Sequence, residues 1–359
     1  MLLQPSPGST VDGSDWLVRV RRGTISSIGS FLLALLLGAV VFLALGANPV
    51  SSYQAILSGA LGGGGSLGET LNIWTPFVLT GLAALIPFRA GLWNAGGDGQ
   101  LYAGAVGGIL IGLTFTTLPG PLLALVIVLG AAAAGSLWAL IPAVLKISTG
   151  ASEIIVTLLL NFTAVLLADY VITGPWAEGF SATTRQIPSS AQVGSWVPGT
   201  NVGVGEVTAL ICALGVFLLI QRTRFGFALK MFGSNRGAAQ LAGLSLARTT
   251  LAAFGIGGAL AGLSGGILIV SIHHALVTGM SNNYGFIGIA ATLLAGLNPL
   301  WLLPAAFLFS VLTVGSNNLT ATVGIDPSAG LIVEAVFVVL LMALGVLRLR
   351  LWQGGTQSL

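Results

Sequence analysis

Charge is the scarcest property of this sequence. Of its 359 residues, 13 are Lys or Arg and 10 are Asp or Glu, so charged residues make up 6% of the chain. Soluble domains carry roughly 25% charged residues, and so few ionisable groups cannot cover a surface that faces water. Hydrophobic residues account for 55% of the chain, and the uncharged stretches 23–68, 99–145 and 249–325 exceed the ~20 residues of a membrane-spanning helix. These features predict a multi-pass membrane protein.

Residues that carry enzyme chemistry are also few. The only lysines, Lys146 and Lys230, each follow a leucine, so no Gly-Lys-Ser/Thr loop is present to hold nucleotide phosphates. The only histidines, His273 and His274, have no Cys or carboxylate at metal-ligand spacing and no nearby acid for a hydrolase triad. The single cysteine, Cys212, excludes an intrachain disulfide. We expect no enzyme, no cofactor and no metal, which leaves transport or scaffolding.

The apolar stretches, divided at polar, Gly and Pro clusters, predict an all-α helix bundle of about ten transmembrane helices, with a range of eight to ten. The predicted spans are 27–47, 71–89, 99–117, 121–145, 152–173, 205–221, 248–271, 284–297, 299–317 and 329–347. The segments 284–297 and 299–317 are short, so half-helices or a re-entrant pair are alternatives. Residues 25–47 resemble a signal peptide, but the apolar run is too long and nine more predicted spans follow, so we interpret it as an uncleaved first helix. The run Gly62–Gly65 is expected to be a flexible connector.

The positive charges predict the orientation. With Met1 in the cytoplasm and ten alternating spans, every Lys and Arg except Arg185 falls on the cytoplasmic side. Both termini are therefore predicted to be cytoplasmic, with 1–24 as an N-terminal segment, 25–348 as the transmembrane domain and 349–359 as a tail. The net charge of +3 is interpreted as this topology signal, and no nucleic-acid partner is expected.

Two loops stand out. The predicted external loop 174–203 is rich in Pro, Gly and Ser and contains Trp176 and Trp196, so it is either an ordered cap that receives substrate or a solvated connector. The predicted cytoplasmic loop 222–247 combines basic residues with apolar residues at helical spacing. Its basic residues are Arg222, Arg224, Lys230 and Arg236, and its apolar residues are Phe225, Phe227, Phe232, Ala238, Ala239 and Leu241. This pattern predicts a short helix that offers an apolar face to a partner, or one that lies on anionic lipid.

Within the apolar spans, small and polar residues mark special positions. Gly258, Gly262 and Gly266 recur every four residues and predict close helix packing. Glu334 is predicted to lie inside a span, as a pathway residue or a structural hydrogen-bonding group. Glu153 is expected to favour the beginning of its helix, where Ser152 or Thr149 can cap.

Four stretches together carry a family resemblance: "GLWNAGGDGQLYAGA" at 91–105, "GASEIIVTLLLNFTAVLLADYVITGPW" at 150–176, "FGSNRGAAQLAGLS" at 232–245 and "GFIGIAATLLAGLNPL" at 285–300. The chain resembles permease subunits of the branched-chain amino acid, ribose and simple-sugar group of ABC importers, in particular the larger permease of the nucleoside type. Asp98 stands where the family more often has glutamate, and Trp93 where phenylalanine is common.

The resemblance implies a bacterial cytoplasmic-membrane importer for nucleosides or related simple sugars. Its implied partners are cytoplasmic ABC ATPase subunits, a second permease of a different chain, a substrate-binding lipoprotein and membrane lipid. Loop 222–247 would couple to the ATPase, with Arg236, Ala239 and Gly243 at the matching positions.

The polar side chains near the 91–105 stretch suit an uncharged polyol or nucleoside, which needs amide, hydroxyl and aromatic partners. The candidates for this substrate pathway are Trp93, Asn94, Asp98, Gln100, Tyr102, Asn161 and Glu334. Alternatively, the stretch is a structural turn whose side chains cap the flanking spans. An ion-coupled carrier or a permease for ribose or a branched-chain amino acid remains an alternative function, although ion-coupled carriers usually need several intramembrane ionisable groups.

Overall fold

The computed structural model describes residues 33, 35–179, 182–200 and 202–326, with seven further positions after 326. Helices make up nearly all of the regular structure, and across these described residues no strand occurs beyond two isolated bridges, Ala177 with Thr184 and Thr183 with Val277. The prediction of an all-α fold is confirmed. Glu334, the N-terminal segment 1–24 and the tail 349–359 lie outside the described residues.

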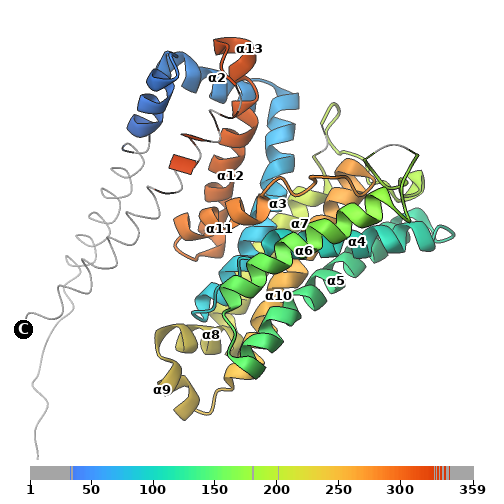
Figure 1. The fold of residues 1–359 in the computed structure, drawn as a ribbon, viewed down its shortest axis with the longest axis vertical. Helices are drawn as coiled ribbons and strands as arrows, with labels where there is room; N and C mark the ends of the chain where they lie inside the picture. Colours follow the sequence, from blue (N-terminus) through green and yellow to red (C-terminus); the bar gives the residue numbers. More distant parts are fainter. Residues whose placement is uncertain are drawn as a thin grey trace, which may run out of the picture.

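Most helices follow one another with short connections, and the longest connection is the segment 174–203 (Figure 1). They are α2 (Pro49–Leu61), α3 (Gly64–Arg89), α4 (Gly97–Thr114), α5 (Gly120–Thr149), α6 (Glu153–Thr173), the 3-10 turn η1 (Ser189–Ala191), α7 (Val204–Arg222), α8 (Arg224–Ser234), α9 (Arg236–Leu241), α10 (Leu246–Ile267), the π-helical turn η2 (Leu268–His273), α11 (Tyr284–Leu294), α12 (Pro299–Ser316) and α13 (Leu319–Val323).

Six helices in the described part of the chain are long and apolar enough to cross a membrane. They are α3, α5, α6, α7, α10 continued through η2, and α12. A seventh span results if the helix Leu35–Ala44 and α2, which meet at a bend of 111°, are one broken span. The predicted number of about ten is not confirmed, nor is the cytoplasmic location of the termini. Most of the predicted span 329–347 lies outside the described residues, and so does part of the predicted span 27–47.

Helix α11 is a half-helix. Its 11 residues rise about 16 Å at 1.5 Å per residue, which is half the ~30 Å hydrocarbon core. Helices α11 and α12 are separated by a turn at 295–298, in which Leu297 has φ 59°. The half-helix alternative therefore fits the first of the two short segments, whereas α12 is long enough to cross a membrane.

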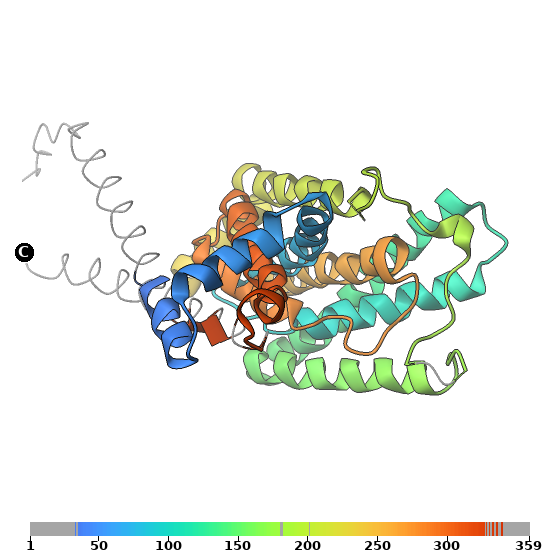
Figure 2. The same ribbon diagram turned by 90° about the horizontal axis from the view of Figure 1, so that it is seen from above.

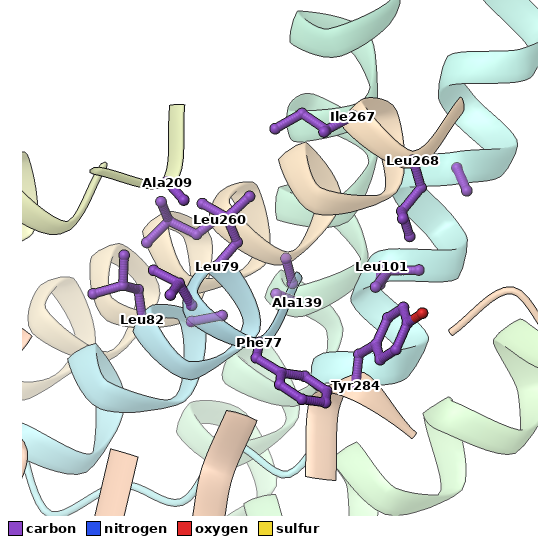
Figure 3. Close-up of a cluster of buried hydrophobic side chains, with 14 of the residues drawn as sticks. Phe77, Leu79, Leu82, Leu101, Ala139, Ala209, Leu260, Ile267, Leu268 and Tyr284 are labelled. Atoms are coloured by element: carbon purple, nitrogen blue, oxygen red, sulfur yellow. The ribbon is translucent and has the colours of Figure 1, made fainter. Parts of the chain in front are cut away.

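Burial separates central from peripheral helices. In α3 and α10, 83% and 78% of the most apolar window is buried inside the protein, whereas in α5, α6 and α7 the share is 28%. Figures 1 and 2 show α10 surrounded by other helices. The central cluster includes Phe77, Leu79 and Leu82 of α3 and Leu260 of α10 (Figure 3). The outward faces of α5 and α6 carry Leu137, Phe162 and Leu166, as expected for helices that contact lipid.

The glycines of α10 lie at its contacts with α5 and α4. A Cβ added to Gly258 or Gly262 would clash with backbone of α5, and one added to Gly266 would lie 2.8 Å from the Ala131 side chain. On the other side, a Cβ on Gly104 of α4 would meet the backbone of Gly262. Hydrocarbon supplies no hydrophobic drive between helices, so this backbone-to-backbone packing supplies the attraction that holds the three together.

Three local predictions need correction. The glycine run is not a plain connector, because Gly64 and Gly65 already belong to α3, which begins seven residues before the predicted Leu71. Ser152 occupies the N-cap of α6, but its side chain makes no capping bond. The hydroxyl of Thr149 instead accepts from Ala151 N, before the helix begins.

The loop 222–247 forms two helices where the sequence predicted one. Thr223 caps α8 by accepting from Gly226 N, and Asn235 caps α9 by accepting from Ala238 N. The capping preference of Asn235 therefore breaks the helical pattern in two. Phe232 and Ala239 are buried against the bundle, whereas Phe227, Ala238 and Leu241 stay exposed, so the predicted apolar face is only partly used within the described residues.

The described cations gather at one end of the bundle. Arg89, Lys146 and Arg222 lie in the last turns of α3, α5 and α7, and Arg248 in the first turn of α10. Helices α8 and α9, which carry the remaining cations of this group, lie together at the lower end in Figure 1. We call this the basic end. Arg185, in the loop between α6 and α7, is the one described cation outside it.

Candidate functional site

A reciprocal amide pair holds the connection between α3 and α4. Gln100 Nε2 donates to Asn94 Oδ1 at 2.9 Å, and Asn94 Nδ2 donates to Gln100 Oε1 at 3.1 Å. Both side chains are 1% exposed. Buried amides cost free energy unless their hydrogen bonds are made, and this pair makes them locally. The segment 91–96, which we call the polar turn, is therefore held in one shape.

Helix α6 completes this arrangement through Asn161. Its Nδ2 donates to Ala95 O at 2.8 Å, and its Oδ1 accepts from Gly99 N at 2.8 Å. Gly99 is the third residue of α4, so its N–H has no partner within the helix. The Gly96 N-cap has no side chain, and Asn161 supplies the missing acceptor from a neighbouring helix.

Asp98 performs the same task for the half-helix α11. Its Oδ1 accepts from Gly285 N at 2.9 Å, at the first turn of α11, and its carboxylate is buried. A negative group at a helix N-terminus is favoured by the unpaired N–H groups and by the helix dipole. Asp98 Oδ2 has no partner among the described residues. The Asp98 side chain thus links α4 to the beginning of α11.

Tyr102 and Trp93 have different surroundings. The buried Tyr102 hydroxyl accepts from Ser281 N at 3.3 Å, in the segment that leads into α11. Trp93 is half exposed and its ring packs on Phe88, with centroids 4.7 Å apart. The structure therefore joins Asn94, Gln100 and Asn161 around the polar turn and links Asp98 and Tyr102 to the segment at the beginning of α11, whereas the Trp93 ring packs on Phe88.

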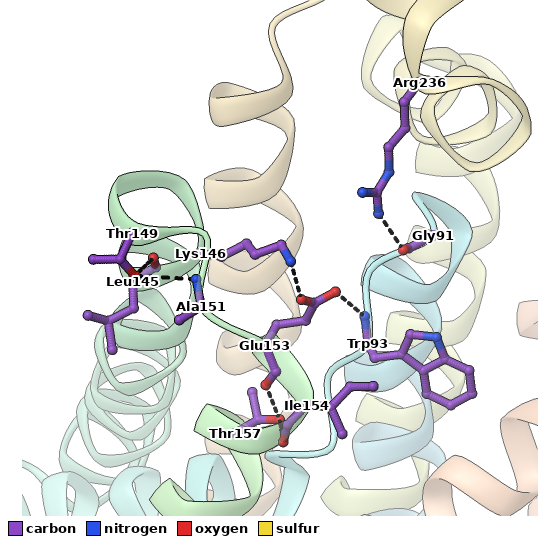
Figure 4. A network of polar contacts seen from close by, with 10 residues as sticks. All are labelled: Gly91, Trp93, Leu145, Lys146, Thr149, Ala151, Glu153, Ile154, Thr157 and Arg236. Carbon is purple, nitrogen blue, oxygen red and sulfur yellow. Dashed lines mark hydrogen bonds and ion pairs between the residues drawn. The ribbon is translucent and has the colours of Figure 1, made fainter.

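At the basic end, α9 is bonded to the polar turn. Arg236 Nη2 donates to Gly91 O at 2.9 Å (Figure 4). Gly91 has φ 68°, a left-handed conformation that glycine adopts without strain. Gly233, near the end of α8, packs so closely on the Arg89 backbone that any side chain there would clash. Helices α8 and α9 therefore contact the beginning of the α3–α4 connection at two neighbouring points.

The other predicted coupling residues form the outer part of this end. Arg222, Arg224 and Lys230 are exposed, as expected of groups that meet water or a partner. Gly243, at φ 80°, terminates α9, where its N–H bonds to Gln240 O and the next N–H bonds to Ala239 O. This is the Schellman arrangement, which favours glycine. Phe227 and Leu241 are exposed beside these charges.

An ion pair braces the same region. Lys146 Nζ lies 2.7 Å from Glu153 Oε2, and Glu153 Oε1 accepts from Trp93 N at 3.5 Å (Figure 4). The pair joins the last turn of α5 to the first residue of α6, and through Trp93 to the polar turn. Sequence reasoning attributed Glu153 to its own helix end alone, because the partner on α5 is recognisable only in the fold.

A recess near the beginning of α3 was missed by sequence reasoning. It is open on one side and has a volume of about 580 Å³. The polar residues lining it are Glu69, Asn72, Thr200, His273 and Tyr284. They come from α3, the 174–203 loop, η2 and α11, segments far apart in the sequence. The only local signal was Glu69 and Asn72, three positions apart and so on one face of an otherwise apolar helix.

The recess lies at the end of the bundle opposite the basic end. Glu69 and Arg89 belong to one continuous helix and are twenty residues apart, or about 30 Å along its axis at 1.5 Å per residue. This equals the thickness of a bilayer core. We call this the loop end, because residues 182–193 run along it and bond to the segment 270–278, for example through Ile187 N to His274 O at 2.9 Å.

Known proteins of similar sequence are transport permeases. The nucleoside ABC transporter permease protein NupB of Lactococcus lactis is 30% identical over 328 residues, covering 88% of this chain and 90% of that protein. The guanosine ABC transporter permease protein NupP of Bacillus subtilis is 32% identical over 315 residues, with 86% and 90% covered. The glucose ABC transporter permease protein TsgB13 of Haloferax volcanii is 32% identical over 356 residues, with 95% and 90% covered.

No solved structure matches the chain. Residues 66–346 match the family described as the permease component of the branched-chain amino acid transport system. This range contains the polar turn, both helices of the basic end and the whole recess except Gly65. The chain belongs to this family of ABC transporter permeases.

Proposed function

We propose that this permease forms the translocation pathway for nucleosides or related simple sugars in the cytoplasmic membrane of a bacterium, driven by separate ATPase subunits. The similarity to permeases named for nucleosides, guanosine and glucose supports this solute class. All are neutral and carry several hydroxyl groups, which suits a chain with few charges.

The basic end is assigned to the cytoplasm. Lys and Arg gather on the cytoplasmic side of membrane proteins, and all described cations except Arg185 lie at or near this end. The loop end then faces outward, where a substrate-binding lipoprotein would deliver solute. A second permease chain is expected to complete the pathway, as the resemblance implies.

The observation that carries the proposal is the contact between α9 and the polar turn. We assign α8 and α9 as the docking site for the ATPase, because they are basic, exposed and attached to the bundle by backbone-close packing and the Arg236–Gly91 bond. A displacement of these helices by the ATPase would move the α3–α4 connection. That connection carries Asn94 and leads into Asp98, so the motion reaches α6 and α11 through their hydrogen bonds.

The predicted pathway residues have a structural task in this conformation, since Asn94, Gln100 and Asn161 bond to one another or to backbone. We propose that they close the pathway on the cytoplasmic side of the recess and exchange partners when α8 and α9 move. Neutral amides are suited to this, because they can bond to solute hydroxyls as well as to backbone.

The test is uptake by proteoliposomes that contain the permease, its co-encoded ATPase, a second permease and the binding protein. Radiolabelled uridine, adenosine and glucose are compared with and without internal ATP. We expect uptake of at least one solute only with ATP and the ATPase. Uptake that persists without the ATPase and follows a proton or sodium gradient would support the ion-coupled alternative instead.

A further inference from the structure

We propose that the recess at the loop end is a reception site for a neutral solute bearing several hydroxyl groups, with Glu69 and Asn72 as its hydrogen-bonding residues. The inference rests on the proposed function and deepens it, since it locates where solute first contacts this chain. The recess volume of about 580 Å³ falls in the range of roughly 300–1,000 Å³ typical of small-molecule sites.

Unpartnered polar atoms gather at this place. Asn72 Oδ1 is buried and has no partner among the described residues, and it borders the recess. Two further buried oxygens without described partners, Ser264 Oγ and Ser271 Oγ, line a small pocket of about 10 Å³ that shares Asn72, Leu268 and Ile272 with the recess. Buried polar groups are usually hydrogen-bonded, so three such oxygens in two adjoining pockets indicate bonding partners that are not part of the chain.

The type of these groups indicates the type of ligand. Asn72 Oδ1 and the exposed Glu69 carboxylate accept hydrogen bonds and cannot donate them. A ligand with O–H or N–H donors fits these acceptors, and a hydroxyl group, which also accepts, fits the donors of the Asn72 amide and the serine hydroxyls as well. The charged residues lining the two pockets are Glu69 and Glu206, both acidic. Their field opposes phosphates and carboxylates, so nucleotides, sugar phosphates and acidic solutes are disfavoured and neutral polyols or nucleosides are favoured.

Aromatic rings complete the lining. His273 and Tyr284 also border the recess, from η2 and the first residue of α11. Planar faces of this kind pack against sugar rings and bases. The π-helical turn η2 has backbone that departs from the regular α-helix ladder, and its Val270 O accepts from Val193 N of the loop at 2.8 Å. Such turns often mark functional sites, and this one carries Ile272 and His273 into the recess.

One residue separates the recess from a contact with α4. Tyr284 lines the recess, and the next residue, Gly285, donates its N–H to Asp98. A solute that contacts Tyr284 therefore contacts the helix end that Asp98 holds. This places the reception site at one end of a continuous chain of contacts, α11 to α4 to the polar turn to α9, with the ATPase docking site at the other.

The experiment uses the complete importer in proteoliposomes with external uridine, adenosine and glucose. Glu69→Gln and Asn72→Ala are compared with Glu178→Gln, an exposed carboxylate in the 174–203 loop that does not line the recess. Asn72→Ala removes an acceptor, and Glu69→Gln replaces one carboxylate oxygen and the negative charge by an NH2 group, so each variant weakens hydrogen bonding to the solute and we expect at least about a 10-fold fall in uptake. Basal ATP hydrolysis and solute binding to the isolated binding protein should stay within about twofold, as should all activities of Glu178→Gln.

A second measurement does not depend on transport rate. Thr200→Cys in a Cys212→Ala background is treated with a membrane-impermeant maleimide in the assembled importer, with ATP hydrolysis blocked. The transported solute, delivered by its binding protein, should slow labelling at least about fivefold relative to binding protein without solute, by occupying the recess.

The outcomes separate the two proposals. If the wild-type importer takes up none of the three solutes, the proposed function fails and this inference fails with it. If the wild type is active but both recess variants transport like Glu178→Gln, and solute leaves the labelling of the Thr200→Cys variant unaffected, the reception site is wrong and the proposed function stands.

Discussion

Asn161 provides the sharpest test of how the bundle is held together. Replacing it with alanine removes both hydrogen bonds that join α6 to the polar turn and α4, each 2.8 Å long. The side chain is 5% exposed, so water reaches the site poorly. Gly99 N–H and Ala95 C=O are then left without the acceptor and donor they have now.

The magnitude follows from these two groups. A buried polar group left unsatisfied costs about 1–3 kcal/mol, so two of them reduce the free energy of unfolding by about 2–6 kcal/mol. Alanine also leaves a gap beside Gly99, where the Asn161 side chain makes close contact, and this pushes the loss toward the upper part of the range.

The assay is reversible unfolding of the purified permease in mixed micelles, titrated with denaturing detergent and followed by tryptophan fluorescence. The matched control is Thr163→Val on the exposed face of the same helix, whose hydroxyl bonds only to Leu159 O. That change should stay within about 0.5 kcal/mol. Equal stabilities of Asn161→Ala and Thr163→Val would refute the view that α6 supplies the cap of α4.

Three further predictions follow. Arg236→Ala removes an exposed hydrogen bond to Gly91 O, so the free energy of unfolding should change by less than about 1 kcal/mol. ATP-driven uptake should fall about tenfold while ATP hydrolysis continues. Arg248→Ala is the control, and equal uptake by the two variants would contradict the coupling role of Arg236. Gly262→Ala places a Cβ against the Ala131 carbonyl and should lower the free energy of unfolding by about 1–3 kcal/mol through overpacking. Gly215→Ala is the control, because its Cβ meets open space, and it should be neutral or stabilising by up to ~1 kcal/mol. Thermal unfolding in detergent measures both. Asp98→Leu should destabilise the protein by about 1–3 kcal/mol, because it removes the cap of α11. Asp98→Asn keeps an oxygen for Gly285 N and should destabilise it less. If Asp98→Asn were the less stable variant in the same unfolding assay, the capping role of Asp98 would be wrong.

Several features of the fold were accessible from local pattern. Helices α5, α6 and α7 begin and end within a few residues of their predicted bounds, because a membrane span is determined by an uninterrupted apolar length between polar ends. The polar stretch between α3 and α4 was recognised because it interrupts two long apolar runs. Whether its side chains line a substrate pathway or cap the flanking helices could not be decided from the sequence alone.

Other features depended on segments that meet only in space. The bond from Asp98 to Gly285 joins positions 187 residues apart, and nothing near either residue identifies the other. The pairing of Lys146 with Glu153 was hidden for a different reason, since a turn between two helices decides whether their ends face each other. Helix α11 could not be told from a full span by hydropathy, because a half-helix is as apolar as a whole one.

The sequence by itself determined that this is a multi-pass membrane protein, and it predicted which end of the bundle faces the cytoplasm. Those properties depend on composition and on the positions of the positive charges along the chain. Apolar segments partition into lipid and the flanking Lys and Arg set their orientation, whatever the tertiary contacts are. Only the tertiary structure showed which partners the polar residues bond to and where the recess lies. In a nearly uncharged bundle every buried N–H and C=O needs a partner, and the partners of α4 and α11, like the lining of the recess, come from helices far away in the sequence.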